Sequence, residues 1–292
     1  MTDVPLIDLH MHTTVSDGTD TPEEILARVK RAGIGVFSVT DHDAFKSGVV
    51  IRELLGKDDP CFILGAEFSC KDEEGQYHIL GYGFDPDSDP VRSVVETGHR
   101  YRMEKVGERL DYLKRAYGFT FPAEEIDGLY ALDNPGKPHI ASLMVEHGYA
   151  STIEEAIKRY INGIRFTEKY VRPENAIAGI LGSGGIPVLA HPAYGSGDQI
   201  ILGEEMERRL QKLISFGLRG LEAYYSGFTA RLRSGMLRLA EQYGLYVTAG
   251  SDYHGSNKLI ELADTGLESA DALPEGLARF LKDVRKEDHD QI

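Results

Sequence analysis

The stretch LIDLHMHTTVSDGTDTPEEILARVKRAG, residues 6–33, combines a short apolar run, a loop rich in histidine and aspartate, and a helix. Residues 6–9 predict a strand. Thr21 can cap a helix, Pro22 suits its first position, Glu24 completes a capping box and Gly33 predicts its end. A strand followed by a helix is a βα unit, and such units build parallel sheets.

The rest of the chain repeats this alternation, with one long interruption. Between residues 92 and 172 the pattern predicts helices at 94–117, at 140–146 and from about 151 to 161, and no strand. We therefore expect an α/β domain of residues 1–91 and 173–292 with an all-helical insertion, residues 92–172. The further strands that we expect lie at 36–40, 62–64, 78–83, 188–190, 221–224 and 246–249.

Composition excludes several classes of protein. The 292 residues carry a formal net charge of −15 without a basic block, which disfavours duplex-DNA binding because that needs a cationic face. Cys61 and Cys70 exclude a disulfide framework and a thiolate zinc site. No apolar run approaches the ~18 residues of a membrane span, and the first residues lack a signal-peptide pattern. We expect a cytoplasmic protein with no membrane partner.

Histidines and acids gather at the ends of the predicted strands, except that His78 opens one. The carboxyl ends of parallel strands in a barrel converge on one face, so these side chains can meet. Imidazole and carboxylate together suit zinc, manganese or iron. The pattern predicts a divalent-metal site made by His10, His12, Asp17, His42, Glu67, His78, His191, Asp252 and His254.

Three more acids lie within two residues of these histidines. Asp8, Asp41 and Asp43 could be ligands themselves. We favour a different role, in which each accepts a hydrogen bond from an imidazole and so orients it, with facing the substrate as the alternative for Asp43.

The segments DLHMHTTVSDGTDTPEEI, VTDHDA, GAEFS, VLAHP and AGSDYHG resemble the successive motifs of the PHP superfamily, named for polymerase and histidinol phosphatase. In the insertion, GKPHIASLMVEHGY and TEKYVRP are similar to the bacterial PHP phosphoesterases that act on nucleoside phosphates and short RNA. The resemblance implies a distorted (β/α)7 TIM-like barrel, the PHP fold, with two or three divalent ions (Mn²⁺, Zn²⁺ or Fe²⁺) in its mouth.

The resemblance also implies how the ligands are shared. His10, His12 and Asp252 would hold one ion. Asp17, His42 and His254 would hold a second. His78 and His191 would hold a third, with Glu67 bridging.

The chain departs from the family pattern in two of these motif regions. Relatives commonly follow the His-Pro pair with Gly-Arg, where this chain has Ala193 and Tyr194. A glycine usual after the last motif is replaced by Ala263, with Gly266 later. The departure at Ala193 and Tyr194 puts the phosphate or base contacts in question and leaves the metal ligands intact.

The expected activity is metal-dependent hydrolysis of a nucleotide phosphomonoester, from a nucleoside mono- or 3′,5′-bisphosphate, by a hydroxide that bridges two ions. One alternative is a 5′-to-3′ exoribonuclease acting on short 5′-phosphorylated RNA. Another is a non-catalytic metal-binding PHP module of the kind found in polymerases.

Substrate contacts are harder to assign. Arg102 could bind phosphate as a fork or be a solvated helix residue, and His139 could protonate the leaving group, bind phosphate or cap its helix. Lys258 and Lys137 are weaker candidates for binding phosphate. The aromatic residues Tyr224, Tyr225 and Phe228 could stack a base or simply pack the loop that carries them.

Overall fold

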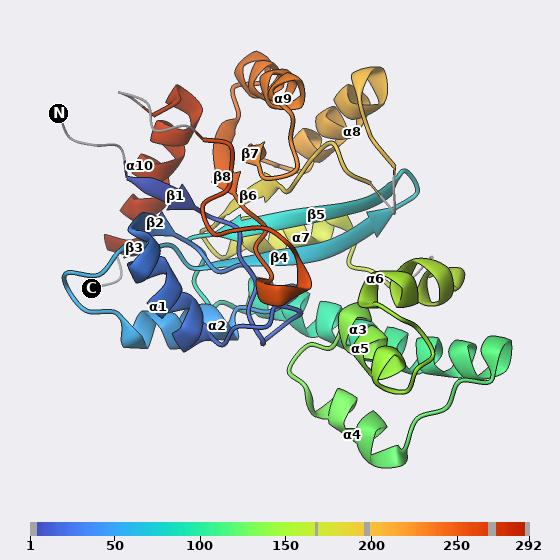
Figure 1. The fold of residues 1–292 in the computed structure, drawn as a ribbon. Helices are drawn as coiled ribbons and strands as arrows, with labels where there is room; N and C mark the ends of the chain where they lie inside the picture. Colours follow the sequence, from blue (N-terminus) through green and yellow to red (C-terminus); the bar gives the residue numbers. More distant parts are fainter. Residues whose placement is uncertain (1–4, 167–168, 196–198, 268–272, 290–292) are drawn as a thin grey trace.

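The strands of the computed structural model form two sheets surrounded by helices (Figure 1). The structure describes residues 5–166, 169–195, 199–267 and 273–289. The first sheet is parallel and has the order β1 (Leu6–Asp8), β2 (Ile34–Phe37), β3 (Cys61–Phe62). The second has the order β4 (Gly65–Asp72), β5 (Gly75–Tyr82), β6 (Ile186–Leu189), β7 (Gly220–Tyr225), β8 (Tyr246–Gly250).

The expectation of an entirely parallel arrangement is wrong for β4 and β5. These strands form an antiparallel hairpin, and β5 also pairs antiparallel with β6, whereas β6, β7 and β8 are parallel. The hairpin turns at Glu73 and Glu74, where Asp72 Oδ1 accepts the N–H of Glu74 at 2.8 Å. Gly75 follows with a φ of 143°, a conformation that glycine adopts easily.

Backbone contacts connect the two sheets. The N–H of Leu9, just after β1, donates to the carbonyl of Ala249 in β8 at 2.8 Å. On the other side an isolated parallel bridge pairs His42, in the loop after β2, with Glu67 in β4. Over the described ranges these local contacts join the sheets, and a closed barrel is not seen.

The first helix has the ends that its sequence predicts. Thr21 Oγ1 accepts the N–H of Glu24 at 3.3 Å, Glu24 Oε2 accepts the N–H of Thr21 at 2.8 Å, and Gly33 ends the helix with a φ of 70°. In the described chain no helix is both long and apolar enough to cross a bilayer. The helices outside the predicted insertion are α1 (Pro22–Ala32), α2 (Lys46–Leu54), α7 (Pro173–Gly182), α8 (Gly203–Ser215), α9 (Ala230–Gln242) and α10 (Glu275–His289).

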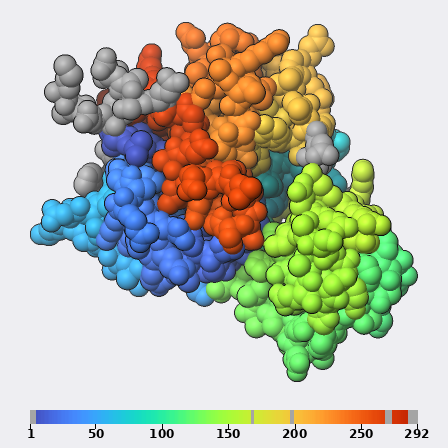
Figure 2. Space-filling view, viewed as in Figure 1, coloured from blue at the N-terminus to red at the C-terminus, as the bar shows by residue number. Residues whose placement is uncertain are grey.

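A run of helices separates β5 from α7 and projects as a lobe from the rest of the molecule (Figures 1 and 2). Its own buried cluster includes Val106, Leu113, Ile140 and Met144. The run consists of α3 (Asp89–Tyr117), α4 (Ala123–Ala131), α5 (Lys137–Glu146), α6 (Ile153–Glu155), a π-helical turn (Ala156–Tyr160) and a 3₁₀ turn (Ile161–Gly163).

Helix α3 belongs to both parts of the molecule. Near its start it packs against α7, and its later turns supply Val106 and Leu113 to the cluster of the lobe. At Gly98 it passes close to the loop after β2, because a Cβ there would lie 2.9 Å from Asp43 Oδ1. The absence of a side chain at Gly98 therefore permits this approach.

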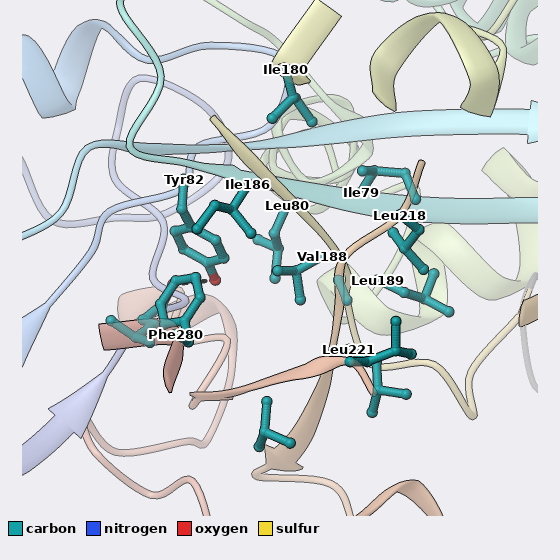
Figure 3. Close-up of a cluster of buried hydrophobic side chains, with 14 of the residues drawn as sticks. Ile79, Leu80, Tyr82, Ile180, Ile186, Val188, Leu189, Leu218, Leu221 and Phe280 are labelled. Carbon is teal, nitrogen blue, oxygen red and sulfur yellow. Dashed lines mark hydrogen bonds between the residues drawn. The ribbon is translucent and has the colours of Figure 1, made fainter. Parts of the chain in front are cut away.

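The main core lies between the second sheet and its helices (Figure 3). Leu80 and Val188 face each other across β5 and β6, and the rings of Tyr82 and Phe280 meet edge-on with centroids 5.2 Å apart. The Tyr82 hydroxyl donates to the carbonyl of Leu9 at 2.9 Å. This bond fixes the chain just after β1, next to His10.

Candidate metal centre

The structure brings all the predicted metal-binding residues together around Glu67, which is only 1% exposed. Glu67 Oε2 lies 3.3 Å from His10 Nε2, 3.2 Å from His12 Nε2 and 3.1 Å from His42 Nδ1. His10 and His12 follow β1, and His42 follows β2. Three imidazoles from neighbouring loops therefore converge on one carboxylate oxygen.

The other oxygen of Glu67 faces two more histidines. Glu67 Oε1 lies 2.8 Å from His78 Nδ1 and 3.2 Å from His191 Nε2. Across the hairpin, Glu67 lies opposite Leu80, and Ser69 lies opposite His78. Because Glu67 and Ser69 are two residues apart in β4, both pairs lie on the same face of the sheet, and so Glu67 and His78 share that face. Burial raises the pKa of Glu67, but the surrounding histidines, His78 first among them, hold it well below its usual range.

Asp252, in the loop after β8, forms a second point of convergence. Its Oδ1 lies 3.3 Å from His12 Nε2, 3.6 Å from His10 Nε2 and 3.4 Å from His254 Nδ1. Its Oδ2 is held from outside by Lys258 at 2.6 Å and by the hydroxyl of Tyr225 at 3.0 Å. One oxygen therefore faces the histidines while the other is fixed.

Asp17 completes the cluster from the loop before α1. Its Oδ1 lies 3.4 Å from His254 Nε2 and 3.6 Å from His12 Nδ1, and its Oδ2 lies 3.9 Å from His42 Nε2. This is the acid that the resemblance to the PHP superfamily groups with His42 and His254.

The chemistry of the cluster fits divalent cations. His10 Nε2, His12 Nε2 and His42 Nδ1 are buried and have no hydrogen-bond partner in the part of the chain that the structure describes. Leaving such nitrogens unsatisfied is costly, and a cation would satisfy them. The groups whose ligand atoms lie close enough to share an ion are His12, Asp17, His42 and His254; His10, His12 and Glu67; and His42, Glu67 and His78.

Glu222 in β7 was not predicted to belong to the site. Its Oε1 lies 3.0 Å from His10 Nδ1, and its Oε2 accepts the backbone N–H of His191 at 2.8 Å. It is fully buried. The signal in the sequence is an acid within the predicted strand 221–224, where a buried carboxylate needs partners.

The backbone is strained at two of the predicted ligands. His191 has a φ of 27° and Asp252 a φ of 59°, in the left-handed region that residues with side chains seldom adopt. Such strain persists where the surrounding structure imposes it, and it clusters at functional sites. Ala263, which replaces the expected glycine, also has a positive φ of 62°.

Within the described residues, the three neighbouring acids bind groups other than imidazoles, contrary to expectation. Asp41 accepts the N–H of Thr13 at 2.8 Å, its hydroxyl at 2.7 Å and the hydroxyl of Ser16 at 2.6 Å, and it also accepts from Ser47. It therefore fixes the loop between His12 and Asp17.

Asp8 and Asp43 likewise accept hydrogen bonds from backbone N–H groups. Asp8 accepts the N–H of Ser251 at 2.9 Å and that of Ala263 at 2.8 Å, which secures the loop after β8. Asp43 accepts the N–H of Ser69 at 2.9 Å and pairs with Arg102. The short polar side chains beside the metal centre thus set the shape of its loops.

The candidate substrate-binding residues lie at the edge of the cluster. Arg102 is buried, with Nη2 2.8 Å from Asp43 Oδ2 and 3.2 Å from Ser69 Oγ, so it is not a solvated helix residue. His139 Nδ1 accepts the N–H of Gly136 at 2.9 Å at the start of α5, as its alternative role as a cap predicts.

The aromatic residues near β7 pack closely. The ring of Tyr225 lies 5.5 Å from that of His191 and 5.2 Å from that of Phe228, which is buried. Tyr194 donates to the carbonyl of Gly227 at 2.6 Å. Packing therefore accounts for the contacts of Tyr225 and Phe228, and base stacking stays a prediction.

Comparisons with known proteins find similarity over most of the chain. A model of the PHP domain matches residues 8–207, more than half of the chain. A 5′-3′ exoribonuclease from Haemophilus influenzae is 29% identical over 263 residues, 87% of this chain and 92% of that one. A 3′,5′-nucleoside bisphosphate phosphatase from Chromobacterium violaceum is 26% identical over 260 residues, 85% of this chain and 87% of that one.

Two further matches cover almost the same extent. A phosphoribosyl 1,2-cyclic phosphate 1,2-diphosphodiesterase from Eggerthella lenta is 30% identical over 255 residues, 85% of this chain and 94% of that one. A solved structure from Bifidobacterium adolescentis, described as an inferred metal-dependent phosphoesterase, has a TM-score of 0.78 and 25% identity. It covers 95% of this chain and 96% of its own, so the shared fold includes the helical lobe. The superfamily predicted from the motifs is confirmed: the chain belongs to the PHP domain family.

Proposed function

We propose that this protein is a metal-dependent phosphoesterase that hydrolyses a phosphomonoester of a nucleotide, a nucleoside mono- or 3′,5′-bisphosphate. The observation that carries the proposal is the convergence of five imidazoles on the buried carboxylate of Glu67, at 2.8 to 3.3 Å. The phosphatase relative from Chromobacterium violaceum supports the substrate class. The net charge of −15 agrees with a small substrate rather than duplex DNA.

The predicted ligand sets remain our proposal for two or three ions, Mn²⁺, Zn²⁺ or Fe²⁺. The proximity of Asp17, His42 and His254 supports one set, and that of His10 and His12 to Asp252 supports another. His78 and His191 share the other oxygen of Glu67, which suits a bridging role for that carboxylate. When bound, divalent cations activate water for attack and stabilise negative charge on the phosphoryl oxygens.

Arg102 and His139 are the proposed contacts to the phosphoryl group. Asp43 and Ser69 hold the guanidinium of Arg102 in place, so its fork is preorganised. Because His139 Nδ1 accepts a hydrogen bond, the neutral ring carries its proton on Nε2. Burial lowers the pKa of His139, which favours a neutral hydrogen-bond donor over a charged acid.

Lys258 is assigned a supporting role. Its ammonium is bonded to Asp252 at 2.6 Å, so it fixes this acid and adds positive charge beside the cluster. We also predict that Lys258 contacts the substrate.

We also propose that the two sheets form the distorted (β/α)7 barrel of the family and that residues 92–172 form a separate insertion domain. The Leu9–Ala249 and His42–Glu67 contacts support the first point, because they join the sheets at both sides. The independent buried cluster of α3, α4 and α5 supports the second. A cytoplasmic location stays a prediction.

The test is a panel of nucleoside mono- and bisphosphates and a short 5′-phosphorylated RNA, assayed after chelation and after addition of Mn²⁺, Zn²⁺ or Fe²⁺. We expect turnover that disappears with chelator and returns with metal. Glu67→Ala should reduce turnover by at least about a hundredfold without loss of fold by circular dichroism. His99→Ala, which lies on α3 outside the cluster, is the matched control. Turnover that survives both chelation and Glu67→Ala would contradict the proposal.

The same panel of substrates distinguishes the two alternative functions. The Haemophilus influenzae relative favours a 5′-to-3′ exoribonuclease as the second candidate, and preference for the phosphorylated RNA would establish it. A non-catalytic PHP module would bind metal and turn over none of the substrates.

A further inference from the structure

Strand β7 has an irregularity beside the metal centre. Glu222 pairs with Thr248 of β8. The next pair is Tyr224 with Ala249, so β7 has one residue more than β8 at this point. Such a bulge reverses the alternation of side chains between the two faces of a strand. Glu222 and Tyr225, which are three residues apart, therefore both reach predicted metal ligands.

The side chain of Tyr225 contacts two of these ligands. Its hydroxyl donates to Asp252 Oδ2 at 3.0 Å, and the centre of its ring lies 5.5 Å from that of His191. Asp252 and His191 are the two predicted ligands with a positive φ, 59° and 27°. Strained backbone of this kind persists only where the surrounding structure imposes it. Tyr225 is a part of the surroundings that both ligands share.

The bond from Tyr225 affects which oxygen of Asp252 is available to a cation. Oδ2 also accepts from Lys258 Nζ at 2.6 Å, so this oxygen has two donors. Oδ1 lies 3.3 Å from His12 Nε2 and 3.6 Å from His10 Nε2. Turning the carboxylate would break both hydrogen bonds to Oδ2, and hydrogen bonds to an ionised group are strong. Asp252 therefore presents Oδ1 to the cluster.

Tyr194 packs against Tyr225 and fixes the loop that follows it. The centres of the two rings lie 5.8 Å apart. The Tyr194 hydroxyl donates to the carbonyl of Gly227 at 2.6 Å, and the N–H of Phe228 donates to the carbonyl of Tyr225 at 2.9 Å. The turn after β7 is thus held at both ends, which limits the positions that the Tyr225 ring can take.

We propose that Tyr225 is a positioning residue of the metal centre and that Tyr194 acts through it. The Tyr225 hydroxyl keeps Asp252 oriented with Oδ1 towards the cations, and its ring restricts the imidazole of His191. The inference rests on the proposed function, which makes Asp252 and His191 metal ligands. Replacing a residue that orients a metal ligand typically lowers metal affinity by about ten- to a hundredfold.

The test measures binding of Co²⁺, a coloured substitute for the proposed ions. In Tyr225→Phe, the affinity for Co²⁺, measured by competition with a chelator, should fall about tenfold or more. The visible absorption spectrum of bound Co²⁺ should change as well, because the arrangement of the ligands changes. Tyr246→Phe is the matched control, since it removes a bond from Tyr246 to Asp283 of 2.8 Å at the other end of β8. It should equal the wild type in both measurements.

Tyr194→Phe tests the second part of the proposal. This change keeps the ring and removes the bond to Gly227, so Co²⁺ affinity should fall about threefold. In a chain that already carries Tyr225→Phe, the same change should lower affinity by less than about twofold, because residues that act through one another are not additive. Equal falls in the two backgrounds, or no fall in the wild-type background, would overturn the role of Tyr194.

A wild-type value in either measurement on Tyr225→Phe overturns the proposal. The variant should fold, because its ring still packs against Phe228 and Asp252 keeps its bond to Lys258; thermal unfolding of the chelated proteins checks this. Wild-type protein that binds no Co²⁺ would overturn the metal centre and this proposal together. If the wild type binds Co²⁺ but hydrolyses no nucleotide, the proposed function fails alone, and the two binding measurements still decide the role of Tyr225.

Discussion

Glu222 controls the orientation of two predicted ligands at once. One of its oxygens lies 3.0 Å from His10 Nδ1, which leaves His10 Nε2 to face Glu67 and Asp252. The other oxygen accepts the backbone N–H of His191, where φ is positive. An acid that fixes the tautomer of an imidazole and raises its basicity improves that imidazole as a metal ligand.

Glu222→Gln should therefore weaken metal binding by about ten- to a hundredfold, because an amide supplies one acceptor and no charge. The measurement is competition with a chelator of known affinity, read as metal retained per chain. Glu241→Gln, exposed on α9, is the control and should bind metal like the wild type. Equal retention by the two variants would show that Glu222 has only a packing role.

The residues of the site could be predicted better than the rest of the structure, because the motifs that contain them are local in sequence. The predicted ligands are all found in one cluster, since each occupies a short segment at a strand end or hairpin. Glu222 was missed because one acid in an apolar strand has no motif around it. The roles of Asp8 and Asp41 were wrong because proximity in sequence to a histidine does not say which donors the fold brings to a carboxylate.

At the scale of elements, capped helices were predictable and the hairpin of β4 and β5 was not. The signals for α1, from Thr21 to Gly33, are all local and correspond to contacts in the structure. The segment KDEEG, by contrast, interrupts the apolar pattern with charges, although Lys71 and Asp72 still belong to β4. Pairing partners, here Glu67 with Leu80, depend on the turn and cannot be obtained from periodicity alone.

Helix α3 carries a prediction about pH. The folded state lowers the pKa of Lys105 to about 7, chiefly by burial, whereas the unfolded chain binds a proton up to about pH 10.4. Between these values the unfolded state binds more protons, so the contribution of Lys105 to stability increases as pH rises and is lost as pH falls towards 7. The wild type should gain about 3 kcal/mol relative to Lys105→Met from pH 7 to 10.

Urea unfolding of both proteins across this range measures the difference. The comparison cancels the other titrating groups that the two chains share. Parallel pH profiles would mean that Lys105 keeps its charge in the folded protein at all these pH values.

At the scale of the whole molecule, two buried clusters share one polypeptide. The cluster of the lobe contains Met144 and Ile140, and the main core contains Val188 and Leu221. Besides α3, the contacts that connect the two parts include those of Lys46 with Asp133, of Asn134 with the carbonyl of His42, and of Gln76 with Tyr170. How the lobe sits against the metal centre could not be predicted, because the sequence pattern of a helix does not say which neighbour its face meets.

Met144→Ala should separate the unfolding of the two parts. Removing a buried methionine costs about 2–5 kcal/mol, and the loss falls on the lobe. In this variant we expect part of the helical circular-dichroism signal to be lost at a lower guanidinium concentration than in the wild type, while metal is still bound. A second transition at a higher guanidinium concentration should then release the metal. Val188→Ala should instead lower the transition that releases metal. A single coincident transition in Met144→Ala would show that the lobe and the metal-binding part unfold as one unit.

The continuity of α3 has a consequence for how this chain can change. A helix turns by ~100° per residue, so deleting one residue between Gly98 and Arg102 would swing every later side chain a quarter of the way round the axis. Arg102 would then lose its contacts with Asp43 and Ser69, while each residue kept its identity. Changes of helix length in this segment are therefore compatible with activity only in steps of three or four residues, which nearly restore the phase.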